Sequence, residues 1–175
     1  MSKLEKFFYI NTTQKIDFDY IKKIKAALII KCRKGVNLKR YIFIKKECNS
    51  RRIPLFISND IRLLYKLGVK NFYISAYNKK KYRNLPDKIY VIGSAHNVKE
   101  IREKISQGCK KIILSRLFDT YKKGCLGVLK FNLISQKFGN IIALGGIKTK
   151  NIKALKMINV VGAAIKSDID NKPFT

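Results

Sequence analysis

Short apolar runs recur along the whole chain, and polar stretches separate them. Each run is nearly continuous in apolar residues, which is typical of strands that are covered on both faces in a parallel sheet. The eight runs are FFYI (7–10), ALIIKC (27–32), IPLFI (53–57), NFYIS (71–75), KIYVIG (88–93), KIILS (111–115), NIIAL (140–144) and VGAAI (161–165). Because they alternate with helix-like stretches, the pattern predicts an α/β fold with crossover helices.

Helical patterns occupy most of the intervals between these runs. The clearest is 98–107, where Asn97 can cap the first turn and Glu100 stands at the capping-box position. Ile101 and Ile105 share one face of this helix. The remaining expected elements are helices over 37–50, 60–67, 126–138 and 150–158 and a loop over 79–86.

Eight such units predict a compact parallel (β/α)8 TIM barrel, in one domain over residues 1–175. Only six residues follow Ile169, so we expect the last helix to be absent. Barrels of this kind run to about 200 residues or more, so this one is trimmed. The first apolar stretch, FFYI, is too short for a signal peptide, and no apolar run approaches the roughly 20 residues that span a bilayer. We therefore expect a cytoplasmic protein without membrane contact.

The charge balance extends the range of ligands to consider. There are 39 Lys and Arg against 11 Asp and Glu, a formal net charge of +28. Such an excess favours phosphorylated ligands or nucleic acid. The cations are spread rather than grouped, however, and Lys, Asn and Ile are all frequent, so a genome-wide compositional bias is an alternative explanation. No recognised nucleic-acid-binding motif is present, and we do not expect nucleic acid to be the partner.

The cysteine spacing and the single histidine argue against an ordinary zinc site. No Cys-x-x-Cys pair occurs. We expect reduced thiols that serve in packing at Cys32, Cys48, Cys109 and Cys125.

A glycine pair in the segment IIALGGIKTKN (141–151) is the strongest candidate for ligand binding. Gly145 and Gly146 follow an apolar run and precede a polar stretch that can start a helix. Backbone N–H groups without side chains in front of them, next to a helix N-terminus, suit a phosphate. The next run ends in Lys166 and Ser167, and the loops after strands seven and eight of a barrel form a phosphate cradle. The alternative is that Gly-Gly is simply a turn.

Residues at the carboxyl ends of barrel strands line the active site, so these positions supply the other candidates. Their chemistry is cationic and hydroxylic, which suits a phosphate pocket with few groups for acid–base catalysis. The candidates are Lys31, Arg33, Asn59, Asp60, Tyr73, Asn78, Ser94, His96, Thr120, Lys122, Lys123, Gly145, Gly146, Lys166 and Ser167.

Structural roles compete at several of these positions. Asn59 or Asp60 can cap the helix that follows. His96 can be a hydrogen-bonded histidine near a strand end. Solvated surface cations are the alternative for Arg33, Lys122 and Lys123.

Four motifs in order resemble the thiamine phosphate synthase and thiazole tautomerase (TenI-like) family of barrels, over about residues 26–169. IGSAHN is similar to the family's Gly-x-Ser-x-His, and FDTYKKG is similar to its aromatic-Pro-Thr-x-Thr-Lys loop. GGIKTKN resembles its Gly-Gly-Ile followed by Asn, and KSDI resembles its closing Ile-Ser-x-Ile. The matching residues are Ser94, His96, Phe118, Thr120, Lys123, Gly145, Gly146, Ile147, Asn151, Ser167 and Ile169.

This resemblance implies a reaction in which a pyrimidine methyl diphosphate loses pyrophosphate and the ring nitrogen of a thiazole phosphate attacks the cationic carbon. By the family's pattern, Thr120, Gly146 and Ser167 would hold the thiazole phosphate. Lys123 would face the pyrophosphate, and Ser94 would lie near the pyrimidine. We take Arg33 with Lys123 as catalytic candidates, and the further substrate-binding candidates are Asn59, His96, Lys122, Gly145 and Lys166.

The chain departs from the family in its pyrimidine and metal motifs. The family's Gln-x-Arg-x-Lys reads KCRKG over 31–35, which retains only Arg33. The two family positions for metal carboxylates read Asn59 and Asn78. Magnesium usually takes one or two carboxylates together with phosphate oxygens. A Mg²⁺ cofactor is therefore left open, with Asp60 as its candidate ligand.

We expect a thiamine phosphate synthase-like transferase of thiamine biosynthesis, with thiazole phosphate and pyrimidine diphosphate as its small phosphorylated substrates. One alternative is a tautomerase-like or degenerate relative that binds a phosphate ligand without synthase activity. Another is a basic nucleic-acid-associated protein, which a steep loss of affinity with salt would identify. The sequence leaves the oligomeric state open.

Overall fold

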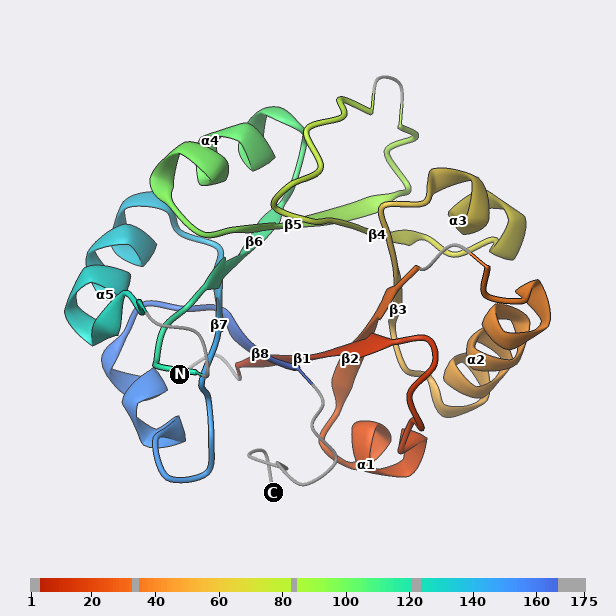
Figure 1. Cartoon of the computed structure of the whole chain (residues 1–175), viewed down its shortest axis with the longest axis horizontal. Coiled ribbons are helices and arrows are strands. Elements are labelled where there is room, and N and C mark those ends of the chain that lie inside the picture. Colours follow the sequence, from red (N-terminus) through yellow and green to blue (C-terminus); the bar gives the residue numbers. More distant parts are fainter. Residues whose placement is uncertain (1–3, 33–34, 83–84, 121–123, 167–175) are drawn as a thin grey trace.

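The computed structural model is a closed barrel of parallel strands ringed by helices (Figure 1). It describes residues 4–32, 35–82, 85–120 and 124–166. The strands follow chain order around the barrel, and β1 pairs with β8 to close it. The predicted TIM barrel and all eight predicted strands are confirmed. The strands are β1 (Glu5–Asn11), β2 (Ala26–Lys31), β3 (Leu55–Ser58), β4 (Asn71–Ile74), β5 (Tyr90–Ala95), β6 (Lys111–Ser115), β7 (Ile141–Leu144) and β8 (Gly162–Lys166).

The strands are apolar throughout because both of their faces are buried. In β2, Ala27 and Ile29 face the barrel interior, whereas Leu28 and Ile30 pack beneath the surrounding helices. This alternation follows from the two-residue period of a strand. The buried residues of the interior are Phe7, Ala27, Ile29, Phe56, Tyr73, Ile92, Ile113, Ile142 and Ala164.

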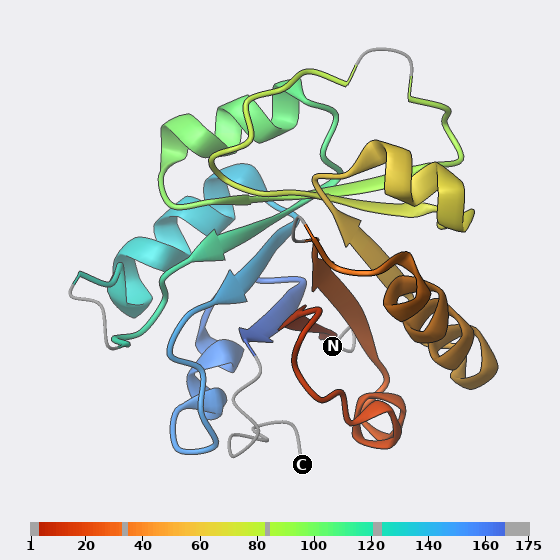
Figure 2. The ribbon, with the colours of Figure 1, turned by 45° about the vertical axis from the view of Figure 1, so that its right-hand side comes forward.

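The helices lie outside the barrel, and the turned view in Figure 2 shows them covering its outer face. The α-helices are α1 (Phe18–Lys23), α2 (Leu38–Arg51), α3 (Ile61–Leu67), α4 (Val98–Ser106) and α5 (Gly127–Phe138). All but α1 were predicted. The six residues of α1 are too few to show a helical period, although the Asp17 side chain caps it by accepting from the Tyr20 N–H. The predicted loop is confirmed over its described residues, 79–82 and 85–86.

The α-helix predicted over 150–158 is wrong. The chain forms a 3-10 helix, η1 (Ile152–Met157). The Asn151 side chain folds back, accepting from the Lys148 N–H at 2.7 Å and donating to the Gly146 carbonyl oxygen at 2.8 Å. It makes no side-chain capping bond to η1.

Of the two isoleucines that share a face of α4, only one is buried. Ile101 is fully buried, but Ile105 is 50% exposed, and Lys104 is buried in its place. An added Cβ on Gly93 of β5 would lie 3.0 Å from Cδ of Lys104, so the lysine stem occupies space that the glycine leaves open. A sequence pattern that assigns burial by hydrophobicity cannot anticipate this exchange.

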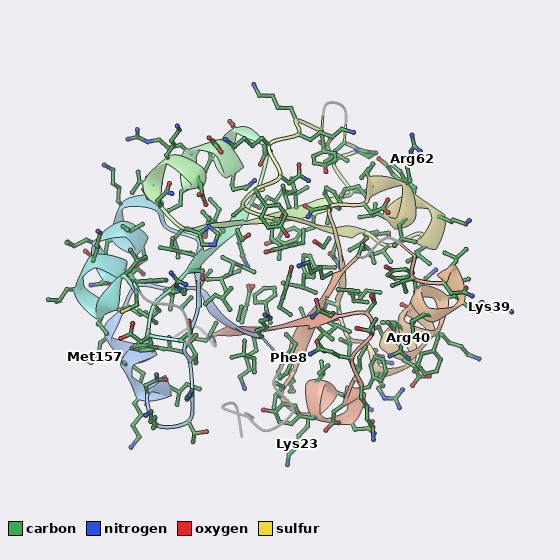
Figure 3. The ribbon with its side chains drawn as sticks, viewed as in Figure 1. Phe8, Lys23, Lys39, Arg40, Arg62 and Met157 are labelled. Atoms are coloured by element: carbon green, nitrogen blue, oxygen red, sulfur yellow. The ribbon has the colours of Figure 1, made fainter. Side chains whose placement is uncertain are left out.

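Basic side chains point outward in several directions rather than gathering on one face. Lys23 on α1, Lys39 on α2 and Arg62 on α3 extend away from the barrel around its rim (Figure 3). No helix in the described part of the chain is long and apolar enough to cross a membrane. The four cysteines are free thiols, and the packing role predicted for Cys125 is wrong because this residue is exposed. Any eighth helix would fall in residues 167–175, outside the described ranges.

Candidate functional site

A pocket of about 140 Å³ opens at the carboxyl ends of the strands. Side chains from β1 and from β4 through β8, with residues that directly follow β4 and β5, form its wall. They are Tyr9, Tyr73, Ser75, Ala76, Tyr77, Ser94, His96, Ile113, Ser115, Leu144 and Ala164. The wall is therefore made of phenol rings, hydroxyl groups, one imidazole ring and aliphatic carbon. Ligand pockets are commonly larger, about 300–1,000 Å³, so this volume suits one small ring of a larger ligand.

Two tyrosines and a serine lie together inside the pocket. The Tyr73 hydroxyl donates to Oγ of Ser94 at 2.8 Å, and the rings of Tyr9 and Tyr73 lie 5.5 Å apart between centroids. Burial raises the pKa of Tyr9 to about 12, and burial also raises the pKa of Tyr73. Both phenols are therefore neutral at physiological pH, and they offer hydrogen bonds rather than charge to a bound ring.

His96 lies at the pocket mouth and is paired with Glu100 on the first turn of α4. The His96 backbone N–H donates to Oε2 of Glu100 at 2.8 Å, and Nδ1 of the ring lies 3.0 Å from the same oxygen. Burial alone would raise the pKa of Glu100, but the hydrogen bonds from His96 lower it overall. As predicted, Asn97 caps α4 through the Glu100 N–H. His96 is thus both a hydrogen-bonded histidine and a residue of the pocket wall.

The glycine pair follows β7 and packs against the loop that follows β6. The Leu117 N–H donates to the carbonyl oxygen of Leu144, and the Phe118 N–H donates to that of Gly145. Gly145 has φ 108° and Gly146 has φ 63°, a region that other residues rarely adopt. An added Cβ on Gly146 would lie 2.5 Å from the Asp119 carbonyl oxygen, so a side chain has no room there.

Two further predicted phosphate ligands, Thr120 and Lys166, belong to neighbouring parts of the barrel. Thr120 is in the loop after β6 whose backbone bonds to the end of β7. Lys166 ends β8, which pairs with β7 as far as Leu144 and Ala164. Lys166 is exposed. The helix N-terminus predicted directly after the glycines is wrong, since η1 begins only at Ile152.

The two positions where the family has metal carboxylates hold a hydrogen-bonded amide pair. Nδ2 of Asn78 donates to Oδ1 of Asn59 at 2.9 Å. The same Oδ1 accepts from the Ser75 N–H at 2.9 Å, and Nδ2 of Asn59 donates to Oγ of Ser75 at 2.8 Å. These side-chain groups are already bonded to protein and carry no negative charge, so they do not fit a magnesium ion.

Asp60 caps a helix and does not bond to either of these two residues, and its role as a metal ligand stays a prediction. Its Oδ1 accepts from the Leu63 N–H at 2.9 Å, which makes it the N-cap of α3. No group of three or more His, Cys, Asp or Glu side chains suited to a metal ion occurs within the described ranges. The predicted site residues Arg33, Lys122, Lys123 and Ser167 lie outside those ranges.

Several residues of the site could not be identified as candidates from the sequence. Tyr9 lies in the middle of an apolar run, and only the strand period places its side chain inside the barrel. Ser75 and Tyr77 follow β4 and line the pocket, but no pattern of residues around them indicates their orientation. Lys104, which contacts the same loop from α4, had no recognisable signal at all.

Three comparisons place the chain among known proteins. The sequence model of the family described as "Thiamine monophosphate synthase" matches residues 33–169. "Thiamine-phosphate synthase 1" of Streptococcus pneumoniae (strain ATCC BAA-255 / R6) is 27% identical over 137 residues, covering 73% of this chain. The match covers 65% of that relative, a little less than two thirds of its length.

Solved structures of the same fold include two thiamine phosphate pyrophosphorylases. The protein from Pyrococcus furiosus has a TM-score of 0.71 at 13% identity, over 94% of this chain and 86% of that one. The protein from Bacteroides thetaiotaomicron has a TM-score of 0.63 at 15% identity, over 92% and 82% of the two chains. These likenesses establish the shared fold, and the sequence match carries the assignment: the chain belongs to the thiamine monophosphate synthase family.

Proposed function

We propose that this protein is a thiamine phosphate synthase, which joins a pyrimidine methyl diphosphate to a thiazole phosphate and releases pyrophosphate. The observation that carries the proposal is the contact between the loop after β6 and the glycine pair after β7. The Leu117 and Phe118 N–H groups donate to the carbonyl oxygens of Leu144 and Gly145, and Leu144 pairs with Ala164 of β8. Leu144 and Ala164 also line the pocket of about 140 Å³, which is large enough for one heterocycle. A phosphate anchor beside a ring-sized pocket is what a phosphorylated heterocycle requires.

The proposed roles follow from this arrangement. Backbone N–H groups of Gly145 and Gly146, with Thr120, Lys166 and Ser167, bind the phosphate of the thiazole. Hydroxyl groups in the pocket, above all that of Ser94, orient a ring. The cationic candidates, assigned by resemblance to the family, are Arg33, Lys122 and Lys123.

The chemistry needs positive charge on the leaving group more than it needs a protein base. Negative charge grows on the departing pyrophosphate, and fixed cations near it stabilise the transition state. The described residues that line the pocket include no lysine or arginine. The neutral phenol rings of Tyr9 and Tyr73 present π faces, which attract the positive charge that develops on the pyrimidine carbon. We infer that the chain does this without a magnesium ion at Asn59 and Asn78.

The test is a turnover assay with the purified protein and both substrates. Thiamine phosphate and pyrophosphate should form in equal amounts, with and without a chelator. Failure to form either product with excess magnesium would contradict the synthase proposal.

A second candidate is a relative that binds a phosphate ligand or isomerises a thiazole without joining two substrates. The loss of both metal carboxylates at Asn59 and Asn78 favours it. Calorimetric binding of thiazole phosphate, without product in the turnover assay, would support this candidate. The outward spread of lysine and arginine around the rim gives little support to a nucleic-acid-binding protein (Figure 3).

A further inference from the structure

A buried lysine outside the pocket contacts the loop that forms one wall of it. Lys104 on α4 is fully buried. Its Nζ donates to the carbonyl oxygen of Asn78 at 2.7 Å and to Oε1 of Gln107 at 2.8 Å. Burying an ammonium group is costly unless its hydrogen bonds are satisfied. Burial lowers the pKa of Lys104, which expresses the same cost.

Gln107 contacts the same loop through the nitrogen of its side-chain amide. Its Nε2 donates to the carbonyl oxygen of Asn78 at 3.0 Å and to that of Lys80 at 3.1 Å. Lys104 and Gln107 therefore hold two carbonyl groups of the loop after β4 and also bond to each other. The loop has no regular secondary structure over 79–82. These hydrogen bonds therefore satisfy carbonyl groups that a helix or sheet would otherwise pair.

The contact continues from Lys104 to the pocket wall through two amides. The Asn78 side chain donates to Oδ1 of Asn59 and also to the hydroxyl of Tyr82 at 2.8 Å. Asn59 in turn bonds both the backbone and the hydroxyl of Ser75. Ser75 and Tyr77 line the pocket on this side. The whole connection runs from an ammonium group to the wall without a carboxylate among its bonded groups.

Room for the lysine comes from a glycine in the strand beneath it. An added Cβ on Gly93 would lie 3.0 and 3.1 Å from Cδ and Cγ of Lys104 and 2.8 Å from Sγ of Cys109. The stem of Lys104 thus reaches the loop by passing over Gly93 of β5.

We propose that Lys104 is a positioning residue that holds the pocket wall of Ser75 and Tyr77 in its binding conformation. The ammonium group and the amides Asn59 and Asn78 form a fixed support behind this wall. The support that Lys104 gives to the wall does not depend on which reaction the protein catalyses. The expected loss of affinity for a pyrimidine ligand rests on the proposed function.

The mobility of the pocket wall can be measured without any substrate. The chain contains no Trp, so Tyr77→Trp introduces a single fluorescent reporter at a pocket residue that is 69% exposed. In this background, Lys104→Met removes the ammonium group and keeps an unbranched stem. Lys99→Met is the matched control, because Lys99 is an exposed lysine of the same helix.

Lys104→Met should lower the fluorescence anisotropy of the reporter and increase its quenching by acrylamide, while Lys99→Met leaves both unchanged. Unchanged anisotropy and quenching in folded Lys104→Met protein would overturn the proposal. If Lys104→Met does not fold, Asn78→Ala decides the question. This variant removes the hydrogen bond from the Asn78 side chain to Asn59, on a partly exposed loop. It should lower the anisotropy of the reporter and increase its quenching in the same way.

Binding separates positioning from a general loss of structure. The glycine pair follows β7, whereas the wall follows β4, so Lys104→Met should leave the affinity for inorganic phosphate unchanged. Affinity for the pyrimidine diphosphate should fall about tenfold, within the range that a displacement of about 1 Å produces. An equal loss of affinity for phosphate and for the pyrimidine diphosphate would show a merely structural role. If the wild-type protein binds no pyrimidine diphosphate, the proposed function fails, and the reporter still tests the support of the wall.

Discussion

The hydroxyl of Tyr73 donates a hydrogen bond of 2.8 Å to Oγ of Ser94 inside the barrel. Tyr73 is 4% exposed and Ser94 is 8% exposed, so water has little access to either group. Tyr73 comes from β4 and Ser94 from β5, and their bond fixes the serine hydroxyl that the family resemblance assigns to the pyrimidine.

Removing this donor with Tyr73→Phe should destabilise the protein by about 1–3 kcal/mol, the usual cost of leaving a buried polar group unsatisfied. Urea unfolding measures the change. Tyr65→Phe is the control, because Tyr65 is 51% exposed on α3. Equal unfolding free energies for Tyr73→Phe and the wild type would show that the bond contributes nothing.

Gly146→Ala should abolish phosphate binding at the loop and lower stability. The added methyl group would lie 2.5 Å from the Asp119 carbonyl oxygen and 2.8 Å from Cβ of Phe118, so the loop after β6 must move. Gly139→Ala is a matched control, since Gly139 also has positive φ but has nothing within 4 Å of an added Cβ. We expect Gly139→Ala to cost only the backbone strain, about 1–3 kcal/mol, and to retain phosphate affinity. Calorimetric titration with inorganic phosphate measures both variants, and retained affinity in Gly146→Ala would contradict the assignment.

Asp60 offers a test that separates a helix cap from a metal ligand. Asn and Asp are about equal as N-caps, and replacing either by Ala costs about 1 kcal/mol. Asp60→Asn should therefore leave both stability and turnover unchanged, while Asp60→Ala loses stability alone. A large loss of turnover in Asp60→Asn would restore the carboxylate to a metal site.

The apolar runs predicted the barrel because strands that are buried on both faces consist almost entirely of apolar residues. The direction in which a single polar side chain points cannot be identified from composition in this way. Asn151 could have capped a helix, but its amide closes the glycine loop instead. Lys104 looks like a surface lysine in the sequence, and only the absent side chain of Gly93 makes room for it. Of the pocket wall, Tyr73, Ser94 and His96 were predicted from their positions at strand ends, because the barrel topology dictates where those ends meet.

Alkaline pH should destabilise the fold through its buried thiols. Burial raises the pKa of Cys48 and of Cys109 from 9.0 to about 12. Below pH 9 the thiols are protonated in both the folded and unfolded states, so their contribution is fully present. As pH rises towards 12 the unfolded state loses protons that the folded state keeps, and stability falls. Urea unfolding between about pH 8 and about pH 11 should show this decline, with a shallower slope in Cys48→Ala. An identical slope in the variant would show that Cys48 does not contribute.

The amide pair at Asn59 and Asn78 predicts a gain of magnesium binding on substitution. Asn59→Asp together with Asn78→Asp would place two carboxylates where Nδ2 and Oδ1 now lie 2.9 Å apart. At that distance the like charges repel, unless a divalent cation lies between them. We therefore expect the double variant to be less stable than the wild type without metal and to recover with added Mg²⁺.

The recovery can be read from the melting temperature without any substrate. Binding to the folded state alone contributes about 2.7 kcal/mol when magnesium exceeds its dissociation constant by about a hundredfold. Asn49→Asp controls for added charge, because Asn49 is an exposed residue of α2. The wild type should show no comparable rise, since its Asn59 oxygen already accepts from Ser75 and Asn78 and carries no charge. A magnesium-dependent rise in the wild-type melting temperature that is lost in Asn78→Ala would mean that the native amides do bind the metal, and the inference of metal-independent chemistry would have to be withdrawn.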